Sequence, residues 1–152
     1  VPAIWPVGLS AAAVALAAAT VSAHAPPGLR SNPQVGLVRW HADGTDVIVL
    51  GGVGGRASLG ARTVLEHLRT EGVGSIELLV IADGEVPEST VAAVVAAHVT
   101  AAVVAYGDGL AGSGIDAARA PPVDTIADVG ALQVRFVPAT DRVVVEARPS
   151  AG

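Results

Sequence analysis

The stretch IELLVIADGEVPEST, residues 76–90, joins an apolar run of strand length to an acidic turn and the start of a helix. Its first six residues are apolar apart from one Glu, as in a buried strand. Pro87 suits the first turn of a helix, where its missing N–H costs nothing, and Glu88 suits the positive end of the helix dipole. The stretch predicts a strand over residues 77–81 and a helix over residues 87–98.

Strand and helix patterns alternate on both sides of this stretch. Residues 46–50, DVIVL, are predicted as a strand, and residues 101–106, AAVVAY, as another. Between the strands over residues 46–50 and 77–81, residues 61–70 are predicted as a helix that ends before Gly72, which is suited to a helix C-cap. The apolar positions of that helix recur at i, i+3, i+4 and i+7: Ala61, Val64, Leu65 and Leu68. This alternation predicts a βαβαβ unit of parallel strands.

Further strands are predicted at both ends of the domain. Residues 35–40 are expected to pair with 46–50 as a hairpin across the polar turn HADGT. Residues 130–148, GALQVRFVPATDRVVVEAR, alternate apolar and polar positions and predict a second hairpin closed at PATD. A long loop rich in Gly, Asp, Ala and Pro is expected over residues 107–122. The predicted fold class is α/β, with one mixed sheet around a βαβαβ core and helices covering it.

The composition limits the classes of function. The chain has 152 residues, with 9 basic and 14 acidic residues and a net charge of −5, and every basic residue is Arg. An acidic surface disfavours broad, nonspecific binding of nucleic acid. The absence of cysteine excludes disulfides and thiolate zinc sites. Because aromatic residues make up only 3% of the chain, the core must be built from Ala, Val, Leu and Ile.

The N-terminal segment is apolar and carries no Asp, Glu, Lys or Arg before Arg30. The run Ala3 to Ala23 is long enough to cross about 30 Å of hydrocarbon as a helix rising about 1.5 Å per residue. We therefore predict a transmembrane helix over residues 1–27, a linker over 28–34 and an α/β domain over 35–150. Because the chain opens on Val without a charged flank, we interpret it as a piece of a longer membrane protein, cut before its last span.

Two alternatives for this segment stay open. A signal peptide is one, because SAHA offers a small-residue cleavage site at Ala23 and Ala25, although no basic residue precedes the apolar run. A buried helix of a soluble protein is the other. With a single flank visible, the orientation in the membrane cannot be read from charge.

The glycine-rich turn after the strand over residues 46–50 is the first candidate site. Gly52, Gly54 and Ala57 fit the pattern G-x-G-x-x-G/A, in which glycines let a phosphate approach the backbone at a helix N-terminus. Asp83 ends the next strand, where a ribose-binding acid is expected, but it follows by about 30 residues rather than about 20. The alternative is a plain tight turn. Without Lys, a P-loop is excluded.

The histidines do not form a recognisable metal motif. His24, His41, His67 and His98 are isolated in the sequence, whereas a zinc site needs three or four converging ligands. No G-x-S-x-G motif marks a nucleophile. A Ser-His-Asp triad stays open, because its members converge in space and not in sequence.

The acidic turn is the third candidate, with Asp83, Glu85 and Glu88 within six residues. Such carboxylates are suitable ligands for Mg²⁺ or Ca²⁺. The simpler interpretation is a solvated turn whose charge favours the start of the following helix.

Three segments together resemble the metallo-β-lactamase fold: VIVLGG, ARTVLEHLRTEGV and SIELLVIADGEVPESTVAAVV. They resemble in particular the C-terminal domain of ComEC-type DNA-uptake membrane proteins, over residues 35–148. In that family a strand LLVLT leads into the metal motif H-x-H-x-D-H. Here LLVIA occupies the strand, and the four ligand positions fall on Asp83, Glu85, Pro87 and Glu88. The family's turn Asp is replaced by Leu50.

The resemblance implies a degenerate domain of metal-dependent nuclease ancestry. Proline cannot bind a metal and no downstream His matches, so paired metals that would generate hydroxide are not expected, and neither a cofactor nor catalysis is predicted. The implied role is the non-catalytic C-terminal portion of a protein for competence and transformation. It would lie in the plasma membrane with its domain extracytoplasmic, near lipid, the parent protein's other spans and single-stranded DNA in the channel.

Two other functions stay open, a nucleotide-binding module using residues 51–57 and a membrane-anchored or secreted interaction domain. The sequence does not indicate the oligomeric state.

Overall fold

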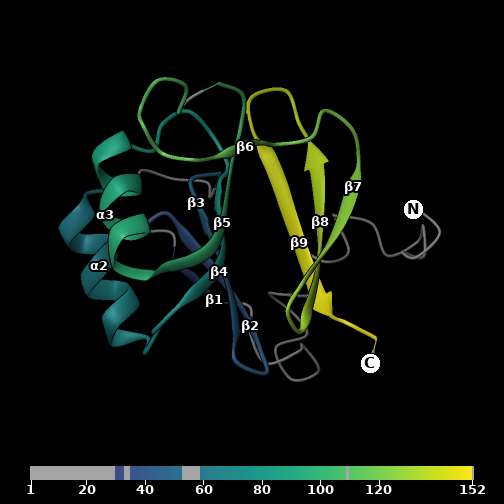
Figure 1. The fold of residues 1–152 in the computed structure, drawn as a ribbon, viewed down its shortest axis with the longest axis horizontal. Coiled ribbons are helices and arrows are strands. Elements are labelled where there is room, and N and C mark those ends of the chain that lie inside the picture. Colours follow the sequence, from purple (N-terminus) through teal and green to yellow (C-terminus); the bar gives the residue numbers. More distant parts are fainter. Residues whose placement is uncertain (1–29, 33–34, 53–58, 109, 152) are drawn as a thin grey trace.

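The computed structural model describes residues 30–32, 35–52, 59–108 and 110–151. Two helices cover one face of a six-stranded sheet, and a three-stranded sheet covers the other (Figure 1). The elements in chain order are β1 (Arg30–Asn32), β2 (Leu37–Ala42), β3 (Thr45–Leu50), α2 (Ala61–Thr70), β4 (Ile76–Ile81), α3 (Glu88–His98), β5 (Val99–Ala105), β6 (Ala118–Arg119), β7 (Thr125–Val129), β8 (Leu132–Pro138) and β9 (Val143–Pro149).

The six-stranded sheet, called the main sheet below, is mixed, and its strands follow one another in chain order from β1 to β6. β1, β2 and β3 pair antiparallel, whereas β3, β4, β5 and β6 pair parallel. α2 and α3 connect β3 to β4 and β4 to β5. The predicted α/β class and the predicted parallel βαβαβ core are confirmed.

Local signals account for the boundaries that the sequence predicts correctly. α2 covers the predicted residues 61–70, and Gly72 follows it with a φ of +73°, which suits a helix C-terminus. The β2–β3 turn uses Asp43 and Gly44 with φ of +44° and +78°. Positive φ at both positions is the type I′ geometry for which Asp-Gly is a preferred pair.

The main sheet is apolar on both faces. Toward the helices, Ile48, Leu50, Leu79 and Ile81 pack with residues of α2 and α3 such as Leu68. Toward the small sheet, the intervening residues of β3 and β4 are buried as well, namely Val47, Val49, Leu78 and Val80. Strands buried on both faces need a second covering layer, which the three-stranded sheet supplies.

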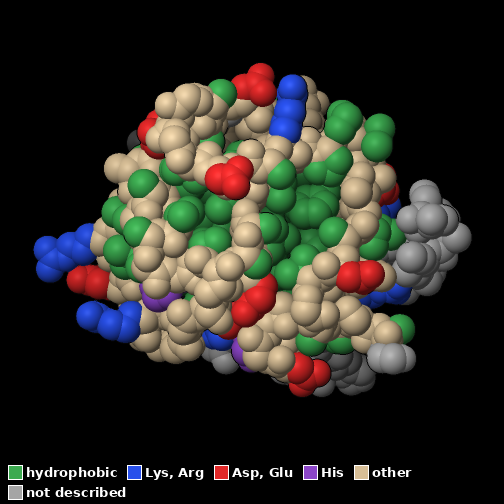
Figure 2. Space-filling model, in the orientation of Figure 1, with side chains coloured by type: hydrophobic (Ala, Val, Ile, Leu, Met, Phe, Trp, Pro, Cys, Tyr) green, Lys and Arg blue, Asp and Glu red, His purple; other side chains and the backbone are tan. Residues whose placement is uncertain are grey.

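The C-terminal hairpin corrects the prediction of one sheet. β8 and β9 do not join the main sheet but form a small three-stranded sheet with β7. Leu132, Val134 and Phe136 of β8 pack against the face of the main sheet that the helices leave uncovered. β7 and the short strands β1 and β6 were not predicted from the sequence. Figure 2 shows apolar side chains gathered in a hollow between the two sheets on the side where β6 and β7 lie.

The predicted transmembrane helix over residues 1–27 lies outside the described residues. In the part of the chain that is described, no helix is long and apolar enough to cross a membrane. Of the predicted linker, residues 30–32 form β1 and pair with β2.

Candidate functional site

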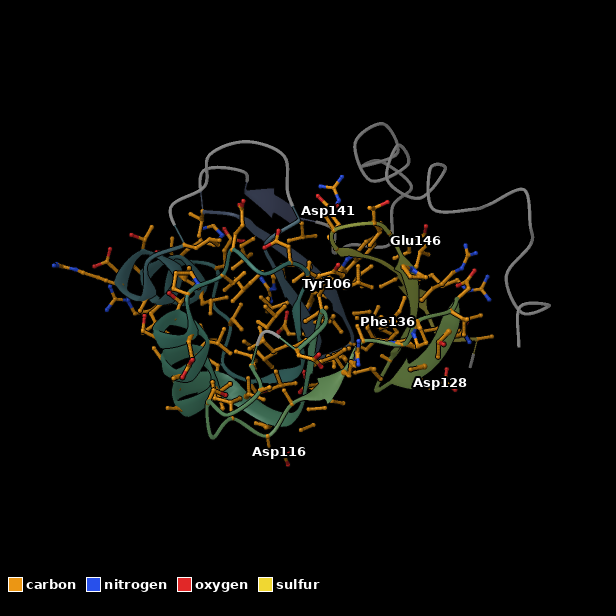
Figure 3. The ribbon with its side chains drawn as sticks, turned by 90° about the horizontal axis from the view of Figure 1, so that it is seen from above. Tyr106, Asp116, Asp128, Phe136, Asp141 and Glu146 are labelled. Carbon is orange, nitrogen blue, oxygen red and sulfur yellow. The ribbon has the colours of Figure 1, made fainter. Side chains whose placement is uncertain are left out.

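The candidate site lies where the parallel strands end. β3, β4 and β5 run parallel, so their carboxyl ends, and the residues that follow them, lie together at one end of the main sheet, called the carboxyl edge below. This edge carries Gly51 and Gly52 after β3, the turn 83–85 after β4 and Tyr106 after β5. Crevices at the carboxyl ends of parallel strands are where α/β sheets bind ligands. Figure 3 looks onto the molecule from above, with Tyr106 between the main sheet and the small sheet.

Asp83 is held by backbone amides from two segments. Its Oδ2 accepts a hydrogen bond from the N–H of Gly52 at 2.5 Å, and its Oδ1 accepts one from the N–H of Glu85 at 2.9 Å. Gly51 has a φ of +81°, and a Cβ there would lie 2.7 Å from Oδ1 of Asp83. The glycine at position 51 is therefore required both by its backbone conformation and by the carboxylate beside it.

Arg142, from the turn between β8 and β9, closes the same corner. Its backbone forms a β-bridge with Asp83, and its guanidinium donates to the carbonyl oxygen of Gly52 at 3.3 Å. Next to it, the N–H of Val143 donates to the carbonyl oxygen of Ala82 at 2.8 Å. These contacts fix the small sheet to the ends of β3 and β4.

The other two acids of the turn do not converge with Asp83. Glu85 and Glu88 are both exposed, and Pro87 stands as the N-cap of α3. Glu88 lies in the first turn of that helix, where a negative charge is favourable. Within the described ranges, no group of three or more His, Asp or Glu side chains is arranged to hold a metal ion.

Gly52, the described member of the glycine pattern, does come together with Asp83, in an arrangement different from the one a nucleotide site requires. The N–H of Gly52, which the pattern assigns to a phosphate, already donates to the Asp83 carboxylate. A phosphate at that position would therefore compete with a carboxylate of the same sign. Gly54 and Ala57 lie outside the described residues.

Three of the histidines are described, and the structure puts them in separate places. His41 is on β2, His67 is on α2, and His98 ends α3 with its Nδ1 3.4 Å from the carbonyl oxygen of Gly74. His41 Nδ1 lies 3.1 Å from Oδ1 of Asp46, which also accepts a hydrogen bond from Arg39 at 2.6 Å. This cluster lies at the start of β3, away from the carboxyl edge. His24 lies outside the described residues.

A charged network on the small sheet was not predicted from the sequence. Arg135 on β8 binds the Asp124 carboxylate through Nε at 2.9 Å and approaches Oε2 of Glu146 on β9 at 3.4 Å. Glu146 is only 1% exposed, and its Oε1 has no hydrogen-bond partner. The signal available in the sequence was that Arg135 and Glu146 share a phase in the two strands of one hairpin, which puts them opposite each other.

The network shifts three pKa values. The hydrogen bond from Arg135 lowers the pKa of Asp124, and the same bond raises the pKa of Arg135. Burial raises the pKa of Glu146, although the positive charge of Arg135 acts in the opposite direction. This acid is a component of the small sheet and lies away from the carboxyl edge of the main sheet.

A pocket of ≈ 210 Å³ opens beside the carboxyl edge, and it is lined by the loop that follows β5 and by the strand β6. Apolar residues such as Leu110 and Ile115 line it, with an exposed pair, Asp108 and Arg119, 3.5 Å apart at its border. It has no buried charged side chain that would select a ligand.

No protein-family profile, curated protein or solved structure matches the chain.

Proposed function

We propose that this chain is the non-catalytic C-terminal portion of a ComEC-type membrane protein for DNA uptake. In this proposal residues 1–27 are a transmembrane helix, and the α/β domain is a degenerate metallo-β-lactamase-like domain. It lies beside the channel for single-stranded DNA, on the extracytoplasmic side of the plasma membrane. Its contacts are with lipid and with the parent protein's other spans. Its role is structural or the docking of partners.

The observation that carries the proposal is the bonding of Asp83. In the resemblance this residue stands at a metal-ligand position, yet its two oxygens accept hydrogen bonds from the N–H groups of Gly52 and Glu85. A carboxylate bound in this way joins two strand ends and does not need an ion for its charge to be satisfied. Glu85 and Glu88 are exposed, and within the described residues they do not form with Asp83 a group arranged to hold a metal ion.

The resemblance supplies the DNA-uptake part of the proposal, and two features are consistent with it. The order of elements is strand, helix, strand, acidic turn and helix, as in the segments that carry the resemblance. The acidic composition also fits a domain that does not itself hold nucleic acid over a broad surface.

Metal content and nuclease activity test the non-catalytic part together. The purified full chain is dialysed against Mn²⁺ or Zn²⁺, its bound metal is measured by mass spectrometry of the elements, and cleavage of labelled single-stranded DNA is followed. The proposal predicts far less than one ion per chain and no cleavage above a boiled control. Stoichiometric metal together with cleavage that Asp83→Ala abolishes would refute it.

A further inference from the structure

The strand β7 is the least protected sheet edge in the described part of the chain. Proteins protect edge strands from pairing with other chains by shortness, charge, proline or cover. The main-sheet edges β1 and β6 have three and two residues. At the opposite edge of the small sheet, β9 carries Glu146, Arg148 and Pro149. β7 has five residues, no proline and one charge, Asp128.

The β7–β8 hairpin determines which backbone groups of β7 face the open edge. The turn between Val129 and Leu132 has two residues. In such a hairpin the residues that flank the turn exchange both of their hydrogen bonds, and hydrogen-bonded pairs alternate with other pairs from there. The N–H and C=O groups of Ile126 and Asp128 therefore point outward, on either side of Ala127.

Two copies of the chain could pair their β7 strands antiparallel about a two-fold axis, and charge selects one register for such a pair. If Ile126 faces Ile126 of the second copy, Asp128 faces Asp124, and if Asp128 faces Asp128, two carboxylates meet directly. Like charges directly opposite each other are destabilising. With Ala127 at the axis, each Ile126 faces Asp128 of the second copy, and both carry outward backbone groups that can exchange hydrogen bonds.

The surroundings of β7 are apolar. Val123, just before the strand, is 65% exposed and is the one large hydrophobic residue of the described chain that is exposed. Ala127 and Val129 of β7 are partly buried and pack against the apolar cluster between the two sheets. Figure 2 shows the apolar hollow between the sheets on the side where β7 lies. We propose that this surface binds a second copy of the chain, with β7 pairing antiparallel to β7 about Ala127 so that the two small sheets become continuous.

Single cysteines test the register, because the chain contains none of its own. Ala127→Cys puts two thiols at a non-hydrogen-bonded pair on the axis, where Cβ atoms lie about 4.5–5.5 Å apart, close to the spacing of a disulfide. Under mild oxidation of the full chain, we expect the covalent dimer to form about tenfold faster with Ala127→Cys than with Ile126→Cys or Asp128→Cys. Equal rates, or no cross-linking by Ala127→Cys, would overturn the proposal.

Sedimentation equilibrium of the full chain in mild detergent tests the association itself. A concentration-dependent dimer is expected for the unchanged chain. Ile126→Pro removes an outward N–H from each copy without removing a hydrogen bond to β8, so we expect its dissociation constant to rise on the order of tenfold. Ile126→Val is the matched control and should associate like the unchanged chain.

Three outcomes would contradict the second copy as the partner: a monomer at every concentration, a folded Ile126→Pro chain that dimerises normally, or pairing of a monomeric chain with an unrelated extended peptide. If Ile126→Pro prevents folding, as judged by circular dichroism, the cysteine series still decides. Metal content does not enter either measurement, so this proposal stands or fails separately from the proposed function.

Discussion

The Asp83 carboxylate links the ends of two neighbouring strands, because it accepts one hydrogen bond from the segment after β3 and one within its own turn. Asp83→Ala leaves the N–H groups of Gly52 and Glu85 without this acceptor. Since Asp83 is half-buried, we expect the free energy of unfolding to fall by about 1–3 kcal/mol, measured by urea denaturation. Glu85→Ala, an exposed neighbour, should change it by less than about 0.5 kcal/mol. Equal effects of the two substitutions would argue against the link.

Gly51 gives a second prediction at the level of one residue. In Gly51→Ala, the new Cβ would lie 2.7 Å from Oδ1 of Asp83, on a backbone with φ of +81°. We expect a loss of about 1–3 kcal/mol in the free energy of unfolding, from strain and from displacement of the carboxylate. Gly84→Ala is the matched control, because a Cβ there meets nothing within 4 Å. A Gly51→Ala chain as stable as this control would contradict the described turn.

The small sheet, as an element, has a titrating group of its own. Burial raises the pKa of Glu146 in the folded state above its ordinary value of 4.5, with Arg135 and Asp124 as its charged neighbours. Between the pKa of Glu146 in the unfolded chain and its raised pKa in the folded chain, the folded chain holds a proton on this carboxyl group that the unfolded chain has lost. The stabilising contribution of this proton is complete below about pH 4.5 and is lost as the pH rises through the folded-state pKa. Glu146→Gln should therefore remove a decline in stability with rising pH.

Urea denaturation at a series of pH values from about 4.5 upward measures this decline. Glu85→Gln, which removes an exposed acid, should leave it in place. Asp124 acts with the opposite sign, because its pKa is lower in the folded chain than its ordinary value of 3.8. Its contribution stabilises the folded chain at pH values above 3.8 and is lost as the pH falls through the folded-state pKa. A decline that persists in Glu146→Gln would show that another group causes it.

Elements whose signals are local were predictable from the sequence. α2 has helical apolar spacing and Gly72 after its end, and the β2–β3 hairpin has Asp43 and Gly44 in its turn. The separate small sheet was not predicted, because alternation in β8 shows which residues are buried but not which layer buries them. The available signal was that β3 and β4 are apolar on both faces. β7 was missed because TIADV is short and follows a proline-rich loop.

The candidate site was predictable in its membership but not in its bonding. Asp83 and Gly52 were both identified, but they stand 31 positions apart, and no sequence pattern assigns the N–H of one to the carboxylate of the other. Arg142 was not identified, because the turn that brings it to Gly52 belongs to the small sheet. Side chains that meet across two sheets leave no spacing in the sequence.

For the whole molecule, the proposed membrane span predicts that the full chain stays with membranes after alkaline carbonate extraction. The double substitution Val14→Asp with Leu16→Asp puts two charges near the centre of the predicted span, at roughly 2.5 kcal/mol or more each, and should release it. Val14→Leu with Leu16→Val keeps the composition and should stay bound. A mature chain that mass spectrometry shows to begin after Ala25 would contradict a retained span.

The most direct test of the non-catalytic domain is a crystal of the full chain soaked in Mn²⁺, with anomalous difference density calculated around residues 83–88. We predict no peak within about 2.5 Å of the Asp83 oxygens, which remain hydrogen-bonded to the N–H groups of Gly52 and Glu85. An ordered ion bound by Asp83 together with Glu85 or Glu88, with the bond to Gly52 broken, would contradict the account.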